Sequence, residues 1–182
     1  MWKKHPKALP FLFFSEMWER FGYYLMIGIF TLYLKDATDG FNMDEKDASS
    51  LYGTFIALVF FTPFLGGLIA DRYLGYRRSI ILGGLLMGIG YCTMGVQSEA
   101  MLYLSMTLVI IGNGFFKPNI STLLGNAYTT PEYLTRKTKA TISFIWVSTL
   151  EHLYVIFLAL LYTHLLDGAL HLQLPVWVCL LV

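Results

Sequence analysis

Five apolar segments, each about as long as a membrane-spanning helix, constrain the fold of this 182-residue chain most strongly. They lie near 8–34, 50–70, 79–97, 100–127 and 140–165. A bilayer core of about 30 Å is crossed by a helix of roughly 20 apolar residues. Because 56% of the residues are hydrophobic and only 14% are charged, the chain cannot present a soluble surface. We therefore expect an all-α membrane protein with about five transmembrane helices.

The basic residues between these segments predict how the chain is oriented. Those on the side of the N-terminus are Lys3, Lys4, Lys7, Arg72, Arg77, Arg78, Arg136, Lys137 and Lys139. Only Lys35 and Lys46 fall on the opposite side, in a loop rich in aspartate. By the positive-inside rule we expect the N-terminus to be cytoplasmic, in a multi-pass protein of the plasma or inner membrane.

Four polar side chains lie inside the segment 8–34 at helical spacing. They are Glu16, Glu19, Arg20 and Tyr23, at positions i, i+3, i+4 and i+7. Residues with this spacing share one face of a helix. An ionised group that faces lipid costs a few kcal/mol, so this face must contact protein or a water-filled cavity. Snorkelling to the membrane surface is the alternative, and a depth of roughly 13 to 20 Å argues against it.

Lys117 is a second cation inside an apolar segment. Its distance from Ala127 places it roughly 15 Å from the end of its helix, at the depth of Glu16. Two carboxylates and two cations then sum to zero charge, which is the cheapest way to keep four ionisable groups in a low-dielectric interior. We therefore expect the helices that carry Glu16 and Lys117 to pair through these charges.

The loop between the second and third segments is also charged. It contains Asp71, Arg72, Arg77 and Arg78. The positive-inside rule accounts for the three arginines without any further role, but it does not account for Asp71. A charge network that holds one conformation and breaks in another is the alternative interpretation, and both stay open.

Several other classes of function are excluded. A formal charge of +1 gives no basis for binding nucleic acid, which needs clustered cations. The segment Gly112-Asn113-Gly114 lacks the preceding strand and the spacing of a phosphate-binding loop. The four histidines are scattered and do not have metal-ligand spacing. We predict no enzyme activity, no metal site and no cofactor.

Three blocks of the sequence resemble known motifs. The run from Glu16 to Tyr24 resembles the E-x-x-E-R-F-x-Y-Y signature of proton-dependent oligopeptide transporters. Gly66 to Arg78 is similar to a loop motif of the wider major facilitator superfamily, and Gly112 to Ser121 is similar to the fourth helix of the peptide transporters. The resemblance covers roughly residues 5 to 135. It implies the N-terminal part of a major facilitator bundle and proton-coupled import of di- and tripeptides.

The resemblance also implies roles for individual residues. Proton coupling is carried over to Glu16, Glu19, Arg20 and Lys117, and conformational gating to Asp71, Arg72, Arg77 and Arg78. The peptide would contact Arg20, Tyr23, Tyr24, Phe60, Asn113 and Lys117, with Arg20 and Lys117 holding its carboxylate. Protonation of one glutamate leaves the cluster at +1, which matches a carboxylate ligand. Phe60 stands where the family often has a tyrosine, so this site has one hydroxyl fewer.

The resemblance fades from about Leu134, so we expect one unit at 1–135 and a divergent tail at 136–182 with a fifth helix. Leu150 stands where the family has an asparagine. Glu151 beside His152 fits a proton relay or a position without a selected role. Since the family has at least twelve spans, we expect a truncated chain that lacks the C-terminal half of the transporter. The alternative function is a non-transporting fragment or half-bundle that associates with a partner.

Overall fold

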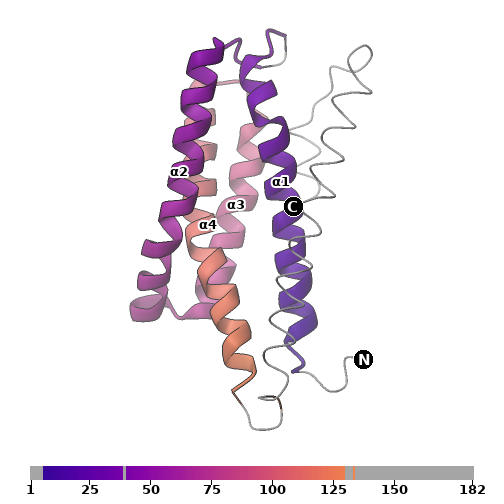
Figure 1. Ribbon diagram of the computed structural model, residues 1–182, viewed down its shortest axis with the longest axis vertical. Helices are drawn as coiled ribbons and strands as arrows, with labels where there is room; N and C mark the ends of the chain where they lie inside the picture. Colours follow the sequence, from indigo (N-terminus) through magenta and orange to yellow (C-terminus); the bar gives the residue numbers. More distant parts are fainter. Residues whose placement is uncertain (1–5, 39, 130–132, 134–182) are drawn as a thin grey trace.

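Four helices form an up-and-down bundle in the computed structural model, which describes residues 6–38, 40–129 and 133. They are α1 (Leu9–Lys35), α2 (Glu45–Ile69), α3 (Tyr76–Met94) and α4 (Glu99–Ala127), and a π-helical turn, η2 (Ala70–Leu74), extends α2. Successive helices run in opposite directions, as Figure 1 shows. The first four predicted spans are therefore confirmed as helices. The predicted fifth helix, with Leu150, Glu151 and His152, lies outside the described residues.

The outer surface of the bundle is apolar. Two helical stretches, Glu45–Leu74 and Glu99–Ala127, are long and apolar enough to cross a membrane. Large hydrophobic side chains on α2 and α3 point outward, among them Phe61, Phe64 and Leu85. Exposing these apolar side chains to water would cost free energy, whereas exposing them to lipid does not. The apolar outer surface thus agrees with the membrane protein that the composition predicts.

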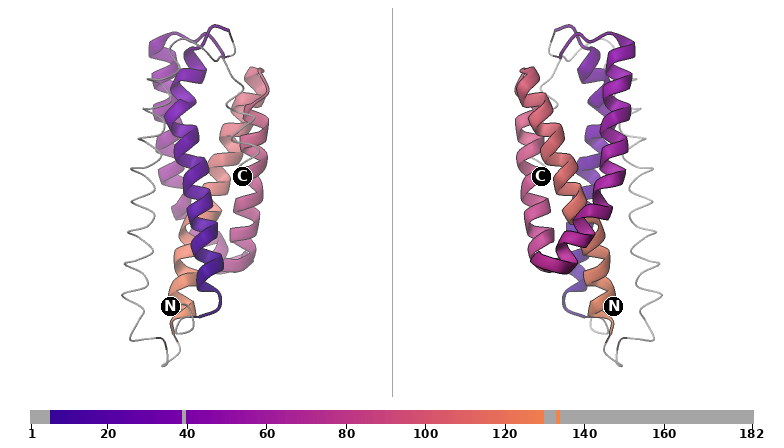
Figure 2. Two further views of the ribbon diagram at one scale, coloured as in Figure 1. Left: turned by 90° about the vertical axis from the view of Figure 1, so that its right-hand side faces the viewer. Right: turned by 90° about the vertical axis from the view of Figure 1, so that its left-hand side faces the viewer.

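Helix α4 lies at the centre of the packing. It packs most extensively against α3, which runs beside it in both views of Figure 2, and α2 packs against another side of it. A methyl group added at Gly83 of α3 would lie 2.6 Å from the carbonyl oxygen of Gly112 on α4. At Gly90 it would lie 2.8 Å from a methyl carbon of Val109. The two backbones approach this closely only because the side chains are absent.

The sequence predicts close helix contacts at Gly66-Gly67, Gly83-Gly84 and Gly88, and the structure confirms them at Gly66 and Gly83. The Gly84-x-x-x-Gly88 spacing in particular predicts a small-residue contact, but a methyl group at Gly84 would only touch the Phe116 ring at 4.0 Å. Gly83 and Gly90 lie two helical turns apart and face α4 instead. Helix α3 is therefore rotated by about one residue from the predicted contact.

A hydrogen bond between side chain and backbone joins α2 to α4 at a proline. Pro63 has no N–H, so the Val59 carbonyl one turn earlier has no helical donor. Nδ2 of Asn113 on α4 donates to this carbonyl at 3.0 Å. Oγ1 of Thr62 donates in the opposite direction, to the Ile110 carbonyl, at 2.9 Å. The break that Pro63 makes in the α2 ladder is thus used to attach α2 to α4.

Replacing Asn113 by leucine is expected to lower the free energy of unfolding by about 1 kcal/mol, because the Val59 carbonyl then stays buried without a donor. The measurement is the unfolding midpoint in mixed micelles. Asn126→Leu changes an exposed asparagine of the same helix and serves as the control. If both variants had the midpoint of the unaltered chain, the Asn113 bond would not stabilise the α2–α4 contact.

Candidate functional site

A buried cluster of charged side chains lies on one face of α1. Glu16, Glu19, Arg20 and Tyr23 are only 4–8% exposed, so the prediction that they share a face turned away from the surroundings is confirmed. Nε of Arg20 donates to Oε1 of Glu16 at 2.8 Å. The same nitrogen lies 3.1 Å from Oε2 of Glu19. One guanidinium group therefore contacts two carboxylates, and its charge partly compensates both of them in the buried interior.

Lys117 does not form the predicted ion pair with α1. Its Nζ lies over the ring of Phe60 on α2, 5.2 Å from the ring centroid, in cation–π geometry. Among the described residues no ion pair of Lys117 is present. Helical geometry brings Arg20 to Glu16 at i+4, whereas α4 makes few contacts with α1. The charges of α1 still act on Lys117, which lies within their electrostatic range.

The net charge of this cluster can change with one proton. Glu16, Glu19, Arg20 and Lys117 sum to zero when all four are ionised. Because Arg20 is shared, protonation of either glutamate weakens one of its two contacts and leaves the cluster with one positive charge. An arginine and a lysine that lose part of their internal compensation can bind a carboxylate from outside.

Aromatic side chains line the same region. The rings of Tyr23 and Tyr24 are in edge contact at 5.5 Å, and the hydroxyl of Tyr24 lies within hydrogen-bonding reach of Arg20. Phe60 is 67% exposed, and Nζ of Lys117 lies over its ring. The residues expected to contact a peptide thus form two groups, Arg20, Tyr23 and Tyr24 on α1 and Phe60 with Lys117 between α2 and α4, and the charge of Arg20 acts on Lys117.

Asn113, the sixth residue expected to contact a peptide, lies inside the contact between α2 and α4. Its side chain is completely buried and its Nδ2 is used by the Val59 carbonyl. Only its Oδ1 has no hydrogen-bond partner. The geometry therefore assigns Asn113 to the contact between α2 and α4, and its contact with a peptide stays a prediction.

The charged loop lies at the end of the bundle where α1 begins, as Figure 1 shows for the turn between α2 and α3. Gly75 turns the chain there with a φ of 74°, a value that favours glycine. The phenol of Tyr76 donates a hydrogen bond to the Asp71 carboxylate, and this contact raises the pKa of Tyr76. No ion pair between Asp71 and an arginine is present among the described residues. The charge network, one of the two interpretations left open by the sequence, is thus not formed here, and gating by Asp71, Arg72, Arg77 and Arg78 stays a prediction.

One buried polar residue near the cluster was missed by sequence reasoning. Tyr91 of α3 is 2% exposed, and the charges of Glu19 and Arg20 act on its hydroxyl. In an apolar segment a tyrosine is hard to distinguish from an ordinary core aromatic residue. The signal that was available is its position one turn after Met87 on the face that contacts α4.

Comparison with known protein families identifies the superfamily of this chain. Residues 12–138 match the family model of the Major Facilitator Superfamily. The chain belongs to this superfamily. Its proteins are transporters and not enzymes, and they are multi-pass proteins of the cell membrane.

Curated relatives connect the chain to the peptide-transporting branch of the Major Facilitator Superfamily. Over 127 residues it is 40% identical to dipeptide and tripeptide permease A of Pectobacterium carotovorum, which covers 69% of this chain and 24% of the relative. The permease of the same name from Chromobacterium violaceum is also 40% identical, over 69% of this chain and 25% of the relative. The resemblance to oligopeptide transporters is thereby confirmed. The chain spans about a quarter of the length of these relatives.

Solved transporter structures have the same fold. A POT family transporter in complex with 5-aminolevulinic acid gives a TM-score of 0.86 at 29% identity, over 100% of this chain and 37% of that protein. The peptide transporter POT in complex with sulfate gives 0.81 at 30% identity, over 100% of this chain and 36% of that protein. The predicted fold class, an all-α membrane protein with a partial N-terminal major facilitator bundle, is confirmed.

Proposed function

We propose that this chain supplies the N-terminal part of a proton-coupled importer of di- and tripeptides, with its N-terminus in the cytoplasm. The observation that carries the proposal is the sharing of Arg20 between Glu16 and Glu19, with Lys117 close by and unpaired among the described residues. The relatives named as dipeptide and tripeptide permeases support peptide as the substrate class.

The geometry suggests how proton and peptide binding are linked. A proton on one glutamate partly releases Arg20, and Arg20 together with Lys117 then holds the carboxylate of the peptide. Loss of the proton restores the shared contact and weakens the hold on the peptide. Each ligand thereby strengthens the binding of the other by the same factor, as linkage requires. Tyr23, Tyr24 and Phe60 would pack against the apolar parts of the peptide.

A non-transporting role is the second candidate. The chain spans about a quarter of its permease relatives, and transporters of this type place the substrate site between two halves of the molecule. We propose that the complementary half of the transporter is the partner. In that case the chain does not transport by itself and acts by associating with this partner.

The test is uptake of a labelled dipeptide into proteoliposomes under an inward proton gradient. The chain is reconstituted alone and together with the remainder of a dipeptide and tripeptide permease, the part of that relative which the chain does not match. We expect gradient-dependent uptake that falls at least about tenfold in Lys117→Ala, since a tenfold change corresponds to about 1.4 kcal/mol of binding. Lys46→Ala, in an exposed position at the start of α2, is the control and should leave uptake unchanged. Absence of gradient-dependent uptake in both preparations would contradict transport and favour the non-transporting fragment.

A further inference from the structure

Lys117 is a half-buried cation whose contact in the bundle is with an aromatic ring. Among the described residues it forms neither an ion pair nor a hydrogen bond. Its Nζ lies 5.2 Å from the centroid of the Phe60 ring on α2. The face of such a ring carries partial negative charge, which attracts an ammonium group, but the ring takes up none of its N–H groups in an ordinary hydrogen bond. A side chain without formal charge is therefore what attracts Lys117 in this structure.

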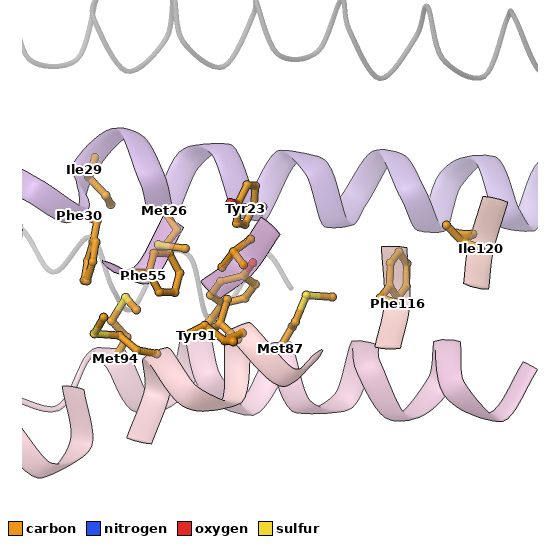
Figure 3. Close-up of a cluster of buried hydrophobic side chains, with 14 of the residues drawn as sticks. Tyr23, Met26, Ile29, Phe30, Phe55, Met87, Tyr91, Met94, Phe116 and Ile120 are labelled. Atoms are coloured by element: carbon orange, nitrogen blue, oxygen red, sulfur yellow. The ribbon is translucent and has the colours of Figure 1, made fainter. Parts of the chain in front are cut away.

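The direction in which Lys117 points follows from the face of α4 on which it lies. Figure 3 shows Phe116, the preceding residue, within the cluster of buried hydrophobic side chains. Lys117 is turned from Phe116 by about 100° around the helix, and it shares a face with Asn113, one turn earlier. Nδ2 of Asn113 donates to the carbonyl of Val59 on α2, and Phe60 is the next residue. The face of α4 that binds α2 thus carries Lys117 to Phe60.

Close contacts on both sides of this pair fix the two helices. On one side is the hydrogen bond from Asn113 to α2. On the other side, a methyl group at Gly67 of α2 would lie 3.6 Å from the Pro118 ring, and Pro118 directly follows Lys117. Sliding of α2 along α4 would disturb both contacts, whereas the flexible stem of a lysine lets its ammonium group move by rotation of its own bonds. Lys117 can therefore exchange partners without a change in helix packing.

The contact with Phe60 is weaker than a contact with a carboxylate would be, because a carboxylate is charged and accepts hydrogen bonds from an ammonium group. Two carboxylates, those of Glu16 and Glu19, lie on α1 and share Arg20. A lysine that was not held elsewhere would be drawn to them, and a carboxylate from outside would then compete with them. A lysine on the Phe60 ring keeps its N–H groups available and can leave the ring for such a ligand.

We propose that Phe60 is a positioning residue for Lys117, whose ring holds the ammonium group on the α2 side, away from Glu16 and Glu19. The lysine thereby stays available for a carboxylate that enters from outside. That this carboxylate belongs to a peptide rests on the proposed transport function, whereas the holding of Lys117 by the ring does not.

The test is the coupling of amine to carboxyl groups by a membrane-permeant carbodiimide in the full chain, reconstituted in lipid vesicles. The reagent joins Lys117 to Glu16 or Glu19 in an amide bond when the two groups are in contact, and mass spectrometry of the linked peptides measures the yield. Lys117→Arg assigns the product by removing it. We expect Phe60→Leu to raise the yield about fivefold, the equivalent of a lost cation–π contact of about 1 kcal/mol.

Two further variants of α2 are the controls. Phe60→Tyr keeps an aromatic ring at this position and should keep the low yield of the unaltered chain. Phe64→Leu makes the same change as Phe60→Leu at a second phenylalanine, which is also 67% exposed, and should leave the yield unchanged. In proteoliposomes that take up the dipeptide, Phe60→Leu should raise KM about fivefold, more than it lowers kcat, and Phe60→Tyr should restore the KM.

Several outcomes would overturn the proposal. One is an equal yield in the unaltered chain and in Phe60→Leu. Another is an equal rise in Phe64→Leu, which would show a general loosening of α2. The coupling result does not depend on transport. A raised yield together with failed peptide uptake would keep Phe60 as a positioning residue and remove the proposed function, whereas normal uptake with an equal yield would remove only the role of Phe60.

Discussion

The variant Arg20→Gln is expected to lose about 3–5 kcal/mol of unfolding free energy, the largest loss of any single change proposed for this chain. The Arg20 guanidinium is the charge that directly contacts both Glu16 and Glu19, and all three side chains are buried. Without it, two carboxylates stay in a low-dielectric interior with no contacting cation. The unfolding midpoint in mixed micelles, followed by helical circular dichroism, measures the loss.

The effect of Arg20→Gln is also expected to depend on pH. Protonated carboxyl groups carry no charge, so the variant recovers stability as the solution is made acidic and loses it as the pH rises. Glu16→Gln combined with Arg20→Gln removes one of the uncompensated charges and should be more stable than Arg20→Gln alone. Arg72→Gln, at an exposed arginine, is the matched control. A loss that is equal at acidic and neutral pH would show that charge compensation is not what Arg20 contributes.

Some features of the site followed directly from the sequence. The shared face of Glu16, Glu19 and Arg20 is fixed by the periodicity of an α-helix, which depends on no other part of the fold. The first four helices were equally predictable, because the length and apolar character of membrane-spanning segments are set by the bilayer. In both cases local geometry and solvent determine the answer.

The partner of Lys117 was not predictable in this way. Counting residues from a helix end gives a depth along the membrane normal, but it gives neither the lateral distance between two helices nor the direction in which a side chain points. Lys117 has the depth of Glu16, yet it lies over Phe60 because α4 packs mainly against α2 and α3. Tertiary packing decided this contact.

Helix rotation limited the prediction of the α3–α4 contact for the same reason. Gly83 and Gly84 are adjacent in the sequence, and only the shape of α4 around Gly112 and Phe116 selects the first of them. The role of Asn113 depends likewise on a carbonyl freed by Pro63 in another helix. A contact between two helices depends on the positions of both, so the sequence pattern of one helix alone does not predict it.

Helix α2 is expected to separate partly from α4 in the variant Gly66→Ala, with a loss of about 3 kcal/mol, at the upper end of the range for overpacked interiors. A methyl group at Gly66 would overlap the carbonyl of Gly114 on α4. This carbonyl has no helical donor because Pro118, four residues later, has no N–H. It belongs to the backbone of a continuous helix, so it cannot turn away as a flexible side chain would.

Gly67→Ala is the matched control for Gly66→Ala. A methyl group at Gly67 would lie 3.6 Å from the Pro118 ring, an ordinary van der Waals distance, so this variant should keep the stability of the unaltered chain. Both substitutions introduce the same residue into the same helix, and their helix propensities therefore cancel in the comparison. Unfolding midpoints of the two variants, measured side by side, separate the steric contact from every other effect of alanine. Equal midpoints would show that α2 and α4 do not approach one another at Gly66 and Gly114.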